Sequence, residues 1–174
     1  MTWGAHLDAG ALHLLIGSTG AGKTTFARRM LRDQSKVIFL SIDAWMAELF
    51  WPDAPDPPDI AWALERVRRV RCRMVATAVD AATAGLAVMI EAGWVDANAR
   101  CGVLDAADLA GLPVIAHLFE TDAETRWSRT QNRNSEGGEL SFPIDRAMFD
   151  EVEAQFRAPA PDELSRHRSV HHYS

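Results

Sequence analysis

The stretch LHLLIGSTGAGKT, residues 12–24, decides the fold of this chain. Residues 12–16 are apolar except for one histidine, and they predict a short buried strand. Residues 17–24 fit the pattern G-x-x-x-x-G-K-[ST], in which glycines let backbone N–H groups curl around a phosphate. A helix predicted over residues 24–32 points its positive end at the same phosphate. A strand, a glycine-rich turn and a helix in this order predict a binding site for a nucleoside triphosphate.

The residues of this turn have separate tasks in holding a triphosphate. Lys23 supplies a positive charge to the β- and γ-phosphates, and Thr24 supplies a hydroxyl to Mg²⁺. ATP or GTP with Mg²⁺ are therefore the expected cofactors, and the alternative is an ordinary glycine-rich turn with an exposed lysine. The glycine spacing does not fit the dinucleotide-binding pattern G-x-G-x-x-G. The predicted nucleotide-binding residues are Gly17, Ser18, Thr19, Gly20, Ala21, Gly22, Lys23, Thr24 and Thr25.

The length and composition indicate one globular domain, which we expect to span residues 1–174. A hydrophobic content of 48% and a charged content of 24% exclude intrinsic disorder. The formal net charge of −6 disfavours a nucleic-acid partner, although a local basic patch would reverse that. The chain has no apolar run of the roughly 20 residues that span a membrane, and its start does not look like a secretory signal. Two distant cysteines fit neither a disulfide scaffold nor a zinc module, so the cytoplasm is the expected compartment.

Strand and helix patterns alternate along the rest of the chain. This order predicts an α/β fold of the P-loop NTPase type, in which helices cover both faces of a parallel sheet of about five strands in three layers. The remaining predicted strands cover residues 36–42, 86–90 and 113–119, and the remaining predicted helices cover 43–50, 59–83, 98–110, 122–133 and 145–156. Loops are predicted at the proline-rich segment 51–59 and at the polar segment 134–140, and the C-terminal segment 164–174 is an edge strand or a frayed tail.

Two acidic residues follow predicted strands, at the edge of a parallel sheet where ligands sit. Asp43 is placed to orient and deprotonate an acceptor hydroxyl as a general base, to cap a helix beginning at Ala44, or to do both. Glu91 occupies the place of the Walker B acid. We expect it to contact Mg²⁺ or the acceptor, and the alternative is an acid at a strand end that faces solvent.

Three arginines lie on the predicted helix before the polar loop. A mobile lid over about residues 126–141 would bring their charge to the γ-phosphate and exclude water. We predict Arg126 and Arg133 as catalytic residues, together with Lys23 and Asp43.

A second group of arginines lies on the long predicted helix, where Arg66, Arg69 and Arg73 share one face. That face is either solvated surface or a site for an anionic acceptor. Trp45 lies just beyond Asp43, beside the proline-rich loop. With Trp51 and Trp62, it either packs in the core or forms an apolar wall for a flat acceptor.

The chain resembles the small P-loop kinases grouped with zeta toxins, chloramphenicol phosphotransferase and the kinase module of polynucleotide kinase. The resemblance covers nearly the whole chain. Its residues are GSTGAGKTT at 17–25, SID at 41–43 and an R-x-x-R lid within 126–133, with a weaker similarity in FRAPAPDE at 156–163. It implies that Asp43 is the base and that Arg100 corresponds to the arginine after the third strand, which we expect to bind the acceptor with Asp43, Trp45 and Glu91.

This resemblance implies an enzyme, a kinase that moves the γ-phosphate of ATP or GTP to a hydroxyl of a small molecule. One alternative is a polynucleotide 5′-hydroxyl kinase, and another is a nucleotide-dependent switch or ATPase without an acceptor. Trp45, Met46 and Ala47 follow Asp43 where the polynucleotide and toxin branches carry an arginine, which disfavours both branches.

Overall fold

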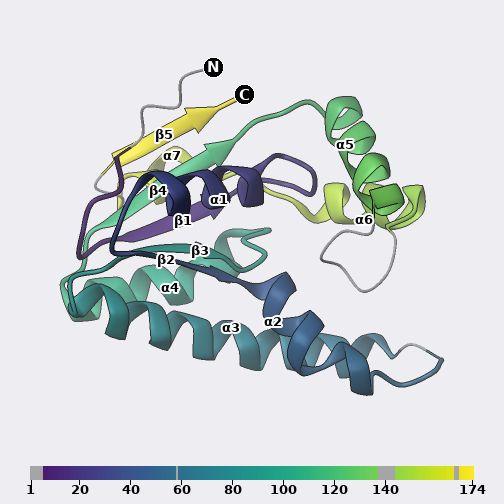
Figure 1. The fold of residues 1–174 in the computed structure, drawn as a ribbon, viewed down its shortest axis with the longest axis horizontal. Helices are drawn as coiled ribbons and strands as arrows, with labels where there is room; N and C mark the ends of the chain where they lie inside the picture. The colour runs from purple at the N-terminus through teal and green to yellow at the C-terminus, as the bar shows by residue number, and fades with distance from the viewer. Residues whose placement is uncertain (1–5, 58, 137–143, 167–168) are drawn as a thin grey trace.

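The centre of the molecule is a five-stranded parallel sheet in the order β2-β3-β1-β4-β5 (Figure 1). The computed structural model describes residues 6–57, 59–136, 144–166 and 169–174. The expected parallel sheet is confirmed, and the C-terminal segment forms its edge strand. The strands are β1 Leu12–Ile16, β2 Val37–Ser41, β3 Ala87–Glu91, β4 Val114–Phe119 and β5 Ser169–Tyr173.

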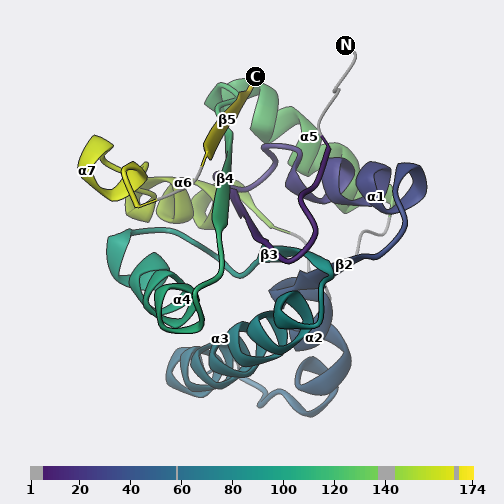
Figure 2. The ribbon, with the colours of Figure 1, turned by 90° about the vertical axis from the view of Figure 1, so that its left-hand side faces the viewer.

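Helices cover both faces of this sheet, which confirms the three layers (Figure 2). On one face, α1 buries Phe26, Ala27 and Met30. On the other face lie α2, α3 and α4, and their buried residues include Met46, Met74 and Leu104. The helices are α1 Lys23–Asp33, α2 Ile42–Leu49, α3 Ile60–Thr83, α4 Ala97–Ala110, α5 Ala123–Glu136, α6 Arg146–Gln155 and α7 Pro161–Leu164, with a short 3-10 turn at Trp51–Asp53.

The central strand β1 is buried from end to end. Its side chains alternate between the faces: Leu12, Leu14 and Ile16 enter the core under α3 and α4, whereas Leu15 enters the core beneath α1. A strand with two apolar faces is typical of a parallel sheet covered on both sides. The carboxyl end of β1 therefore fixes the turn that follows it at the middle of the sheet.

Capping side chains set several helix boundaries. The Asp59 carboxylate accepts from the N–H of Trp62 at 3.2 Å and begins α3, as predicted. For α2 the alternative that Asp43 caps the helix is wrong. The Ser41 hydroxyl accepts from the N–H of Ala44 at 3.5 Å, so the helix begins one residue before Asp43.

The polar loop expected at residues 134–140 begins later than predicted, because α5 continues to Glu136. The rest of that loop and the end of the expected lid, residues 137–141, lie outside the described residues. In the part of the chain that the structure describes, no helix is long and apolar enough to cross a membrane. Cys72 and Cys101 are exposed free thiols.

Two buried histidines, His13 on β1 and His117 on β4, contact each other on the face of the sheet that α1 covers. Nδ1 of His13 lies 3.0 Å from Nε2 of His117, and Nε2 of His13 lies 3.2 Å from the carbonyl oxygen of Asp8. A carbonyl only accepts, so Nε2 of His13 carries the hydrogen, His117 donates to His13, and the Tyr173 hydroxyl donates to His117 at 2.8 Å. Burial lowers the pKa of His13 to about 4 and that of His117 to about 3, so both rings are neutral at pH 7.

This pair makes the free energy of unfolding fall as the pH falls. Between the ordinary pKa of about 6.5 and the lowered native values, the unfolded chain binds protons that the native chain excludes. We expect a loss of about 2 kcal/mol per histidine between pH 6.5 and pH 5, measured by urea unfolding. The variant His117→Gln loses one titrating ring and has a shallower pH dependence, whereas His6→Gln, at an exposed position, keeps the wild-type dependence. Equal stability at pH 7 and pH 5 would contradict the assignment.

Candidate functional site

The turn after β1, residues 17–22, leads directly into α1 and holds its lysine close. Nζ of Lys23 donates to the carbonyl oxygens of Gly17 at 2.9 Å and Ser18 at 3.0 Å. Its side chain is only 12% exposed, so the alternative of an ordinary exposed lysine is wrong. The lysine charge lies over the turn, next to the positive end of α1, as an anion-binding site requires.

Two glycines let neighbouring backbone approach this turn. A Cβ at Gly17 would lie 2.9 Å from both Cβ and the carbonyl oxygen of Phe119, at the end of β4. At Gly20, where φ is +78°, a Cβ would lie 2.5 Å from the carbonyl oxygen of Arg126 in α5. The first turns of α5 are therefore packed directly on the tip of the turn.

Glu91 reaches the turn from the end of β3. Its Oε2 accepts from the Thr24 hydroxyl at 3.2 Å, and its Oε1 lies 3.3 Å from Nζ of Lys23. Glu91 is 8% exposed, so the interpretation as a solvent-facing acid is wrong. A hydroxyl and a carboxylate at this distance suit Mg²⁺, which takes one or two protein oxygens and fills its remaining positions with phosphate oxygens and water. Among the described residues there is no cluster of three or more His, Cys, Asp or Glu side chains that would hold a metal alone.

Asp43 lies at the same edge of the sheet as Glu91. The register of β2 and β3 pairs Ser41 with Glu91, and Asp43 follows two residues later in the first turn of α2, half-buried. The two predicted acids therefore flank the carboxyl ends of neighbouring strands, where ligands of open parallel sheets bind.

Two of the tryptophans beyond Asp43 pack in the way that the core interpretation expects, and the apolar wall for a flat acceptor stays a prediction. Trp45 and Trp51 are half-buried and pack against the core under α3. The Trp62 ring lies 6.0 Å from that of Trp51, and the Arg66 guanidinium carbon lies 3.8 Å from the centroid of Trp62. This cation–π contact engages Arg66. Arg69 pairs with Glu65 at 2.8 Å, so two of the three arginines on this face already have partners.

Arg100 is buried in contacts with the C-terminal segment and is not exposed toward an acceptor. It is 1% exposed, and its guanidinium donates to both carboxylate oxygens of Glu163 in α7 and to the carbonyl oxygens of Trp94 and Arg157, each at 3.0 Å. These contacts give Arg100 a structural role, which differs from the expected acceptor contact. The resemblance placed it correctly after the third strand, but its ionic partner Glu163 lies 63 residues away in sequence.

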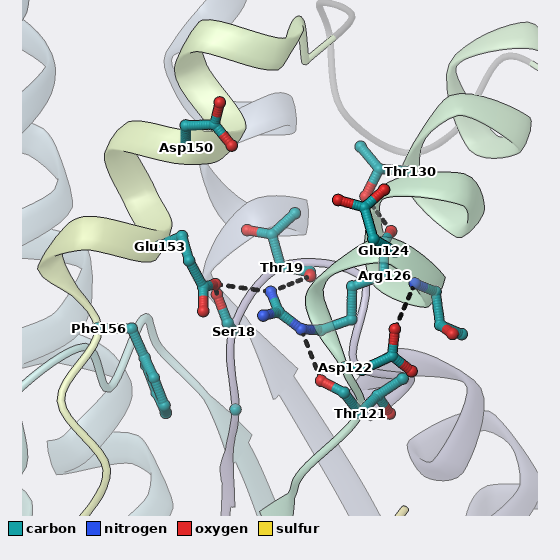
Figure 3. Close-up of polar contacts among 12 residues, drawn as sticks. Ser18, Thr19, Thr121, Asp122, Glu124, Arg126, Thr130, Asp150, Glu153 and Phe156 are labelled. Carbon is teal, nitrogen blue, oxygen red and sulfur yellow. Dashed lines mark hydrogen bonds and ion pairs between the residues drawn. The ribbon is translucent and has the colours of Figure 1, made fainter.

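The arginines of α5 are placed in three different ways, and Figure 3 shows the first of them, Arg126. Arg126 is buried, and it donates to the carbonyl oxygens of Thr121 at 2.9 Å and Thr19 at 3.4 Å. Arg133 is half-buried, and its Nη2 has no hydrogen-bond partner among the described residues. Arg129, which we did not select from the sequence, is exposed, and its Nη1 lies 3.9 Å from the position of a Cβ on Gly22.

A cavity of about 410 Å³ opens beside the turn, between α1, α5 and β5. Gly22, Phe26, Phe119, Thr121, Arg129 and Tyr173 are among its lining residues. The Phe119 and Tyr173 rings are stacked with centroids 4.9 Å apart. Burial raises the pKa of Tyr173 to about 12, so its hydroxyl stays protonated. An aromatic cavity with three arginines in its lining, Arg29, Arg32 and Arg129, suits a flat nitrogen heterocycle.

The fold and the site define a kinase-like P-loop nucleotide-binding domain. The chain belongs to the AAA domain family AAA_33, which it matches over residues 12–159. No curated protein matches the chain in sequence.

Solved structures share this fold at low identity. A chain of the Pnkp1/Rnl/Hen1 RNA repair complex is 17% identical with a TM-score of 0.64, over 88% of this chain and 45% of that one. Kti12 of Chaetomium thermophilum, in complex with ADP-AlF3, is 15% identical with a TM-score of 0.63, over 94% of this chain and 88% of that one. The Mycobacterium tuberculosis APS kinase CysC, in complex with AMPPNP and APS, is 19% identical with a TM-score of 0.54, over 84% of this chain and 95% of that one. This chain thus spans less than half of the RNA-repair chain, and the expected resemblance to small P-loop kinases is confirmed for the fold.

The contact between Gly20 and α5 predicts a strong effect of one methyl group. Gly20→Ala combines a positive φ with a clash against the carbonyl oxygen of Arg126, and we expect it to cost about 2 kcal/mol or more of unfolding free energy. Gly102→Ala in α4 is the matched control, because a Cβ there has no atom within 4 Å and alanine favours the helix. Thermal unfolding compares the two variants. A Gly20→Ala protein as stable as the wild type would show that α5 does not press on the turn.

Proposed function

We propose that this chain is an ATP- or GTP-dependent phosphotransferase whose acceptor is a hydroxyl of a small molecule. The observation that carries the proposal is the cluster of Lys23, Thr24 and Glu91 at the P-loop (residues 17–24), with Asp43 at the same edge of the sheet. Kti12 in complex with ADP-AlF3 and APS kinase in complex with AMPPNP and APS support a nucleotide ligand by similarity of fold.

In this proposal the polyphosphate lies in the P-loop and the heterocycle enters the aromatic cavity beside it. Lys23 exchanges its carbonyl partners for phosphate oxygens, because a charged acceptor binds an ammonium more strongly than a neutral carbonyl. Thr24 and Glu91 would hold Mg²⁺, which supplies charge neutralisation on the phosphates. Arg129 lies beside Gly22, where a guanidinium would contact phosphate or ribose.

Asp43 activates the acceptor. Its carboxylate takes the proton of the acceptor hydroxyl while that oxygen bonds to the γ-phosphorus and the bond from this phosphorus to the β–γ bridging oxygen breaks. The leaving nucleoside diphosphate carries the bridging oxygen with its electron pair. Arg126, which pairs with Glu153, and Arg133, whose Nη2 has no hydrogen-bond partner among the described residues, are the proposed further contacts to phosphate.

A small-molecule acceptor is favoured over a polynucleotide by the state of the arginines on α3. Arg68 and Arg69 both pair with Glu65, and Arg71 donates to the carbonyl oxygens of Ala92 and Gly93. Glu65 offsets part of the positive charge of Arg68 and Arg69 that a nucleic-acid backbone would meet, and the N–H groups that Arg71 donates to neutral carbonyl oxygens are not free for phosphate. The RNA-repair complex keeps a 5′-hydroxyl kinase as the second candidate. Binding of a single-stranded RNA that falls steeply with added salt would favour that second candidate.

The base assignment is tested with Asp43→Asn. We expect nucleotide affinity to stay near the wild-type value and phosphoryl transfer to fall by about 10²- to 10⁴-fold, because the acceptor loses its general base. Glu48→Gln, an exposed acid on the same helix, is the matched control and keeps full transfer. Nucleotide binding is measured by calorimetry, and transfer is measured with labelled ATP and a panel of hydroxyl-bearing metabolites. Full transfer by Asp43→Asn would refute the base assignment.

The P-loop assignment is tested with Lys23→Ala, which removes the charge held over the turn. We expect triphosphate binding to weaken by at least about tenfold, since an ion contact to phosphate is lost. Hydrolysis of ATP without transfer to any acceptor, RNA included, would favour the nucleotide-dependent switch.

A further inference from the structure

The carboxylate of Glu153 on α6 joins three separate parts of the molecule (Figure 3). Its Oε2 accepts from the hydroxyl of Ser18, the second residue of the P-loop, at 2.8 Å. The same oxygen pairs with Nη1 of Arg126 on α5 at 2.7 Å. One carboxylate thus connects α6, α5 and the phosphate-binding turn, a connection that no sequence motif indicates.

Arg126 is held tightly in this arrangement. Its side chain is 6% exposed, and its guanidinium carbon lies 5.5 Å from the ring centroid of Phe149, itself buried on α6. Its other hydrogen bonds go to carbonyl oxygens, which carry no full charge. Glu153 therefore balances the positive charge of Arg126. Hydrogen bonds from Arg126 and then from Ser18 lower the pKa of Glu153, so its carboxylate is ionised at neutral pH.

This pair has a consequence for anions in the P-loop. The ionised carboxylate of Glu153, bonded to Ser18, repels a phosphate that enters the turn. Its negative charge also offsets the attraction that the positive charge of Arg126 would exert on that phosphate over a similar distance. Since the pair is only partly exposed, solvent screens these interactions less than it screens surface charges. For as long as Glu153 stays paired with Arg126, the charge of Arg126 does not contribute to the binding of a polyphosphate in the P-loop.

We propose that Glu153 is a positioning residue that sets the anion affinity of the P-loop. It holds Arg126 in a neutral pair at Ser18, and a polyphosphate competes with it for both partners. This inference rests on the proposed nucleotide binding at the P-loop. A purely structural tie between α5 and α6 would use the same contacts, but its loss would lower stability without raising affinity for anions.

The test compares Glu153→Gln with the wild type by calorimetry, using ATP with Mg²⁺ and, separately, inorganic tripolyphosphate. Glutamine keeps the shape and still accepts from Ser18, but it leaves Arg126 with its charge uncancelled. We expect both probes to bind about fivefold tighter, the effect of about one partly exposed charge pair, with a steeper decline as salt is added. Asp150→Asn is the matched control on the same helix, because Asp150 pairs with the exposed Arg146 instead, and it binds as the wild type does.

A double-mutant cycle assigns the gain to Arg126. In the Arg126→Gln background, the change Glu153→Gln should tighten binding of either probe by a smaller factor, because it then removes only the direct repulsion by the carboxylate and releases no arginine. Binding by Glu153→Gln that is equal to or weaker than that of the wild type would overturn the inference, and so would a gain of the same size or larger in the Arg126→Gln background.

A second measurement uses the wild-type chain, in case Glu153→Gln does not fold. The side-chain N–H signal of Arg126, assigned by comparison with Arg126→Lys, should shift as tripolyphosphate is added and saturate together with the calorimetric binding. A signal that stays unchanged at saturation would overturn the inference.

The two proposals fail in different ways. If the wild type binds ATP and transfers phosphate while Glu153→Gln binds no tighter, only the role of Glu153 is refuted. If the wild type binds neither ATP nor tripolyphosphate, both proposals are refuted. If it binds ATP without transferring phosphate and Glu153→Gln binds tighter, the role of Glu153 stands and the transferase proposal is refuted.

Discussion

The close approach of backbone segments at Gly17 and Gly20 is the constraint on which the rest of the site depends. At Gly17 the end of β4 lies so close that a Cβ would clash with Phe119. At Gly20 a Cβ would clash with the carbonyl oxygen of Arg126 in α5. These contacts fix the turn between the central strand and α5, so the N–H groups of the turn do not need to be ordered by the ligand. The positions of Lys23 and Thr24 follow from that fixed turn, and Glu91 reaches them from the end of β3.

Much of this arrangement could be predicted from the sequence, because its signals are local. The apolar run at residues 12–16 and the glycines after it identify the central strand and the P-loop, and a short strand ending in Glu91 places an acid beside Thr24. The alternation of strands and helices then leaves little freedom in the order of a parallel sheet. The capping of α2 by Ser41 was missed, since the serine and Asp43 are both common cap residues and differ in position by only two.

The roles of the arginines could not be predicted in the same way. Arg100, Arg126 and Arg129 look alike in the sequence, but the first is buried against Glu163, the second pairs with Glu153, and the third is exposed beside Gly22. The partner decides each role, and each partner comes from a distant segment with no periodic signal. The aromatic cavity was missed for the same reason, because Phe26, Phe119 and Tyr173 meet only after β5 has paired with β4.

The order of the strands also bears on the kinetics of the proposed transfer. The aromatic cavity lies toward the β4–β5 side of the central strand, whereas Asp43 follows β2 at the opposite edge. Donor and acceptor would thus approach from separate directions and meet over β1, with neither blocking the entry of the other. Such a layout favours a ternary complex with direct transfer between the two substrates, and it gives no reason for a phosphorylated enzyme to form along the way.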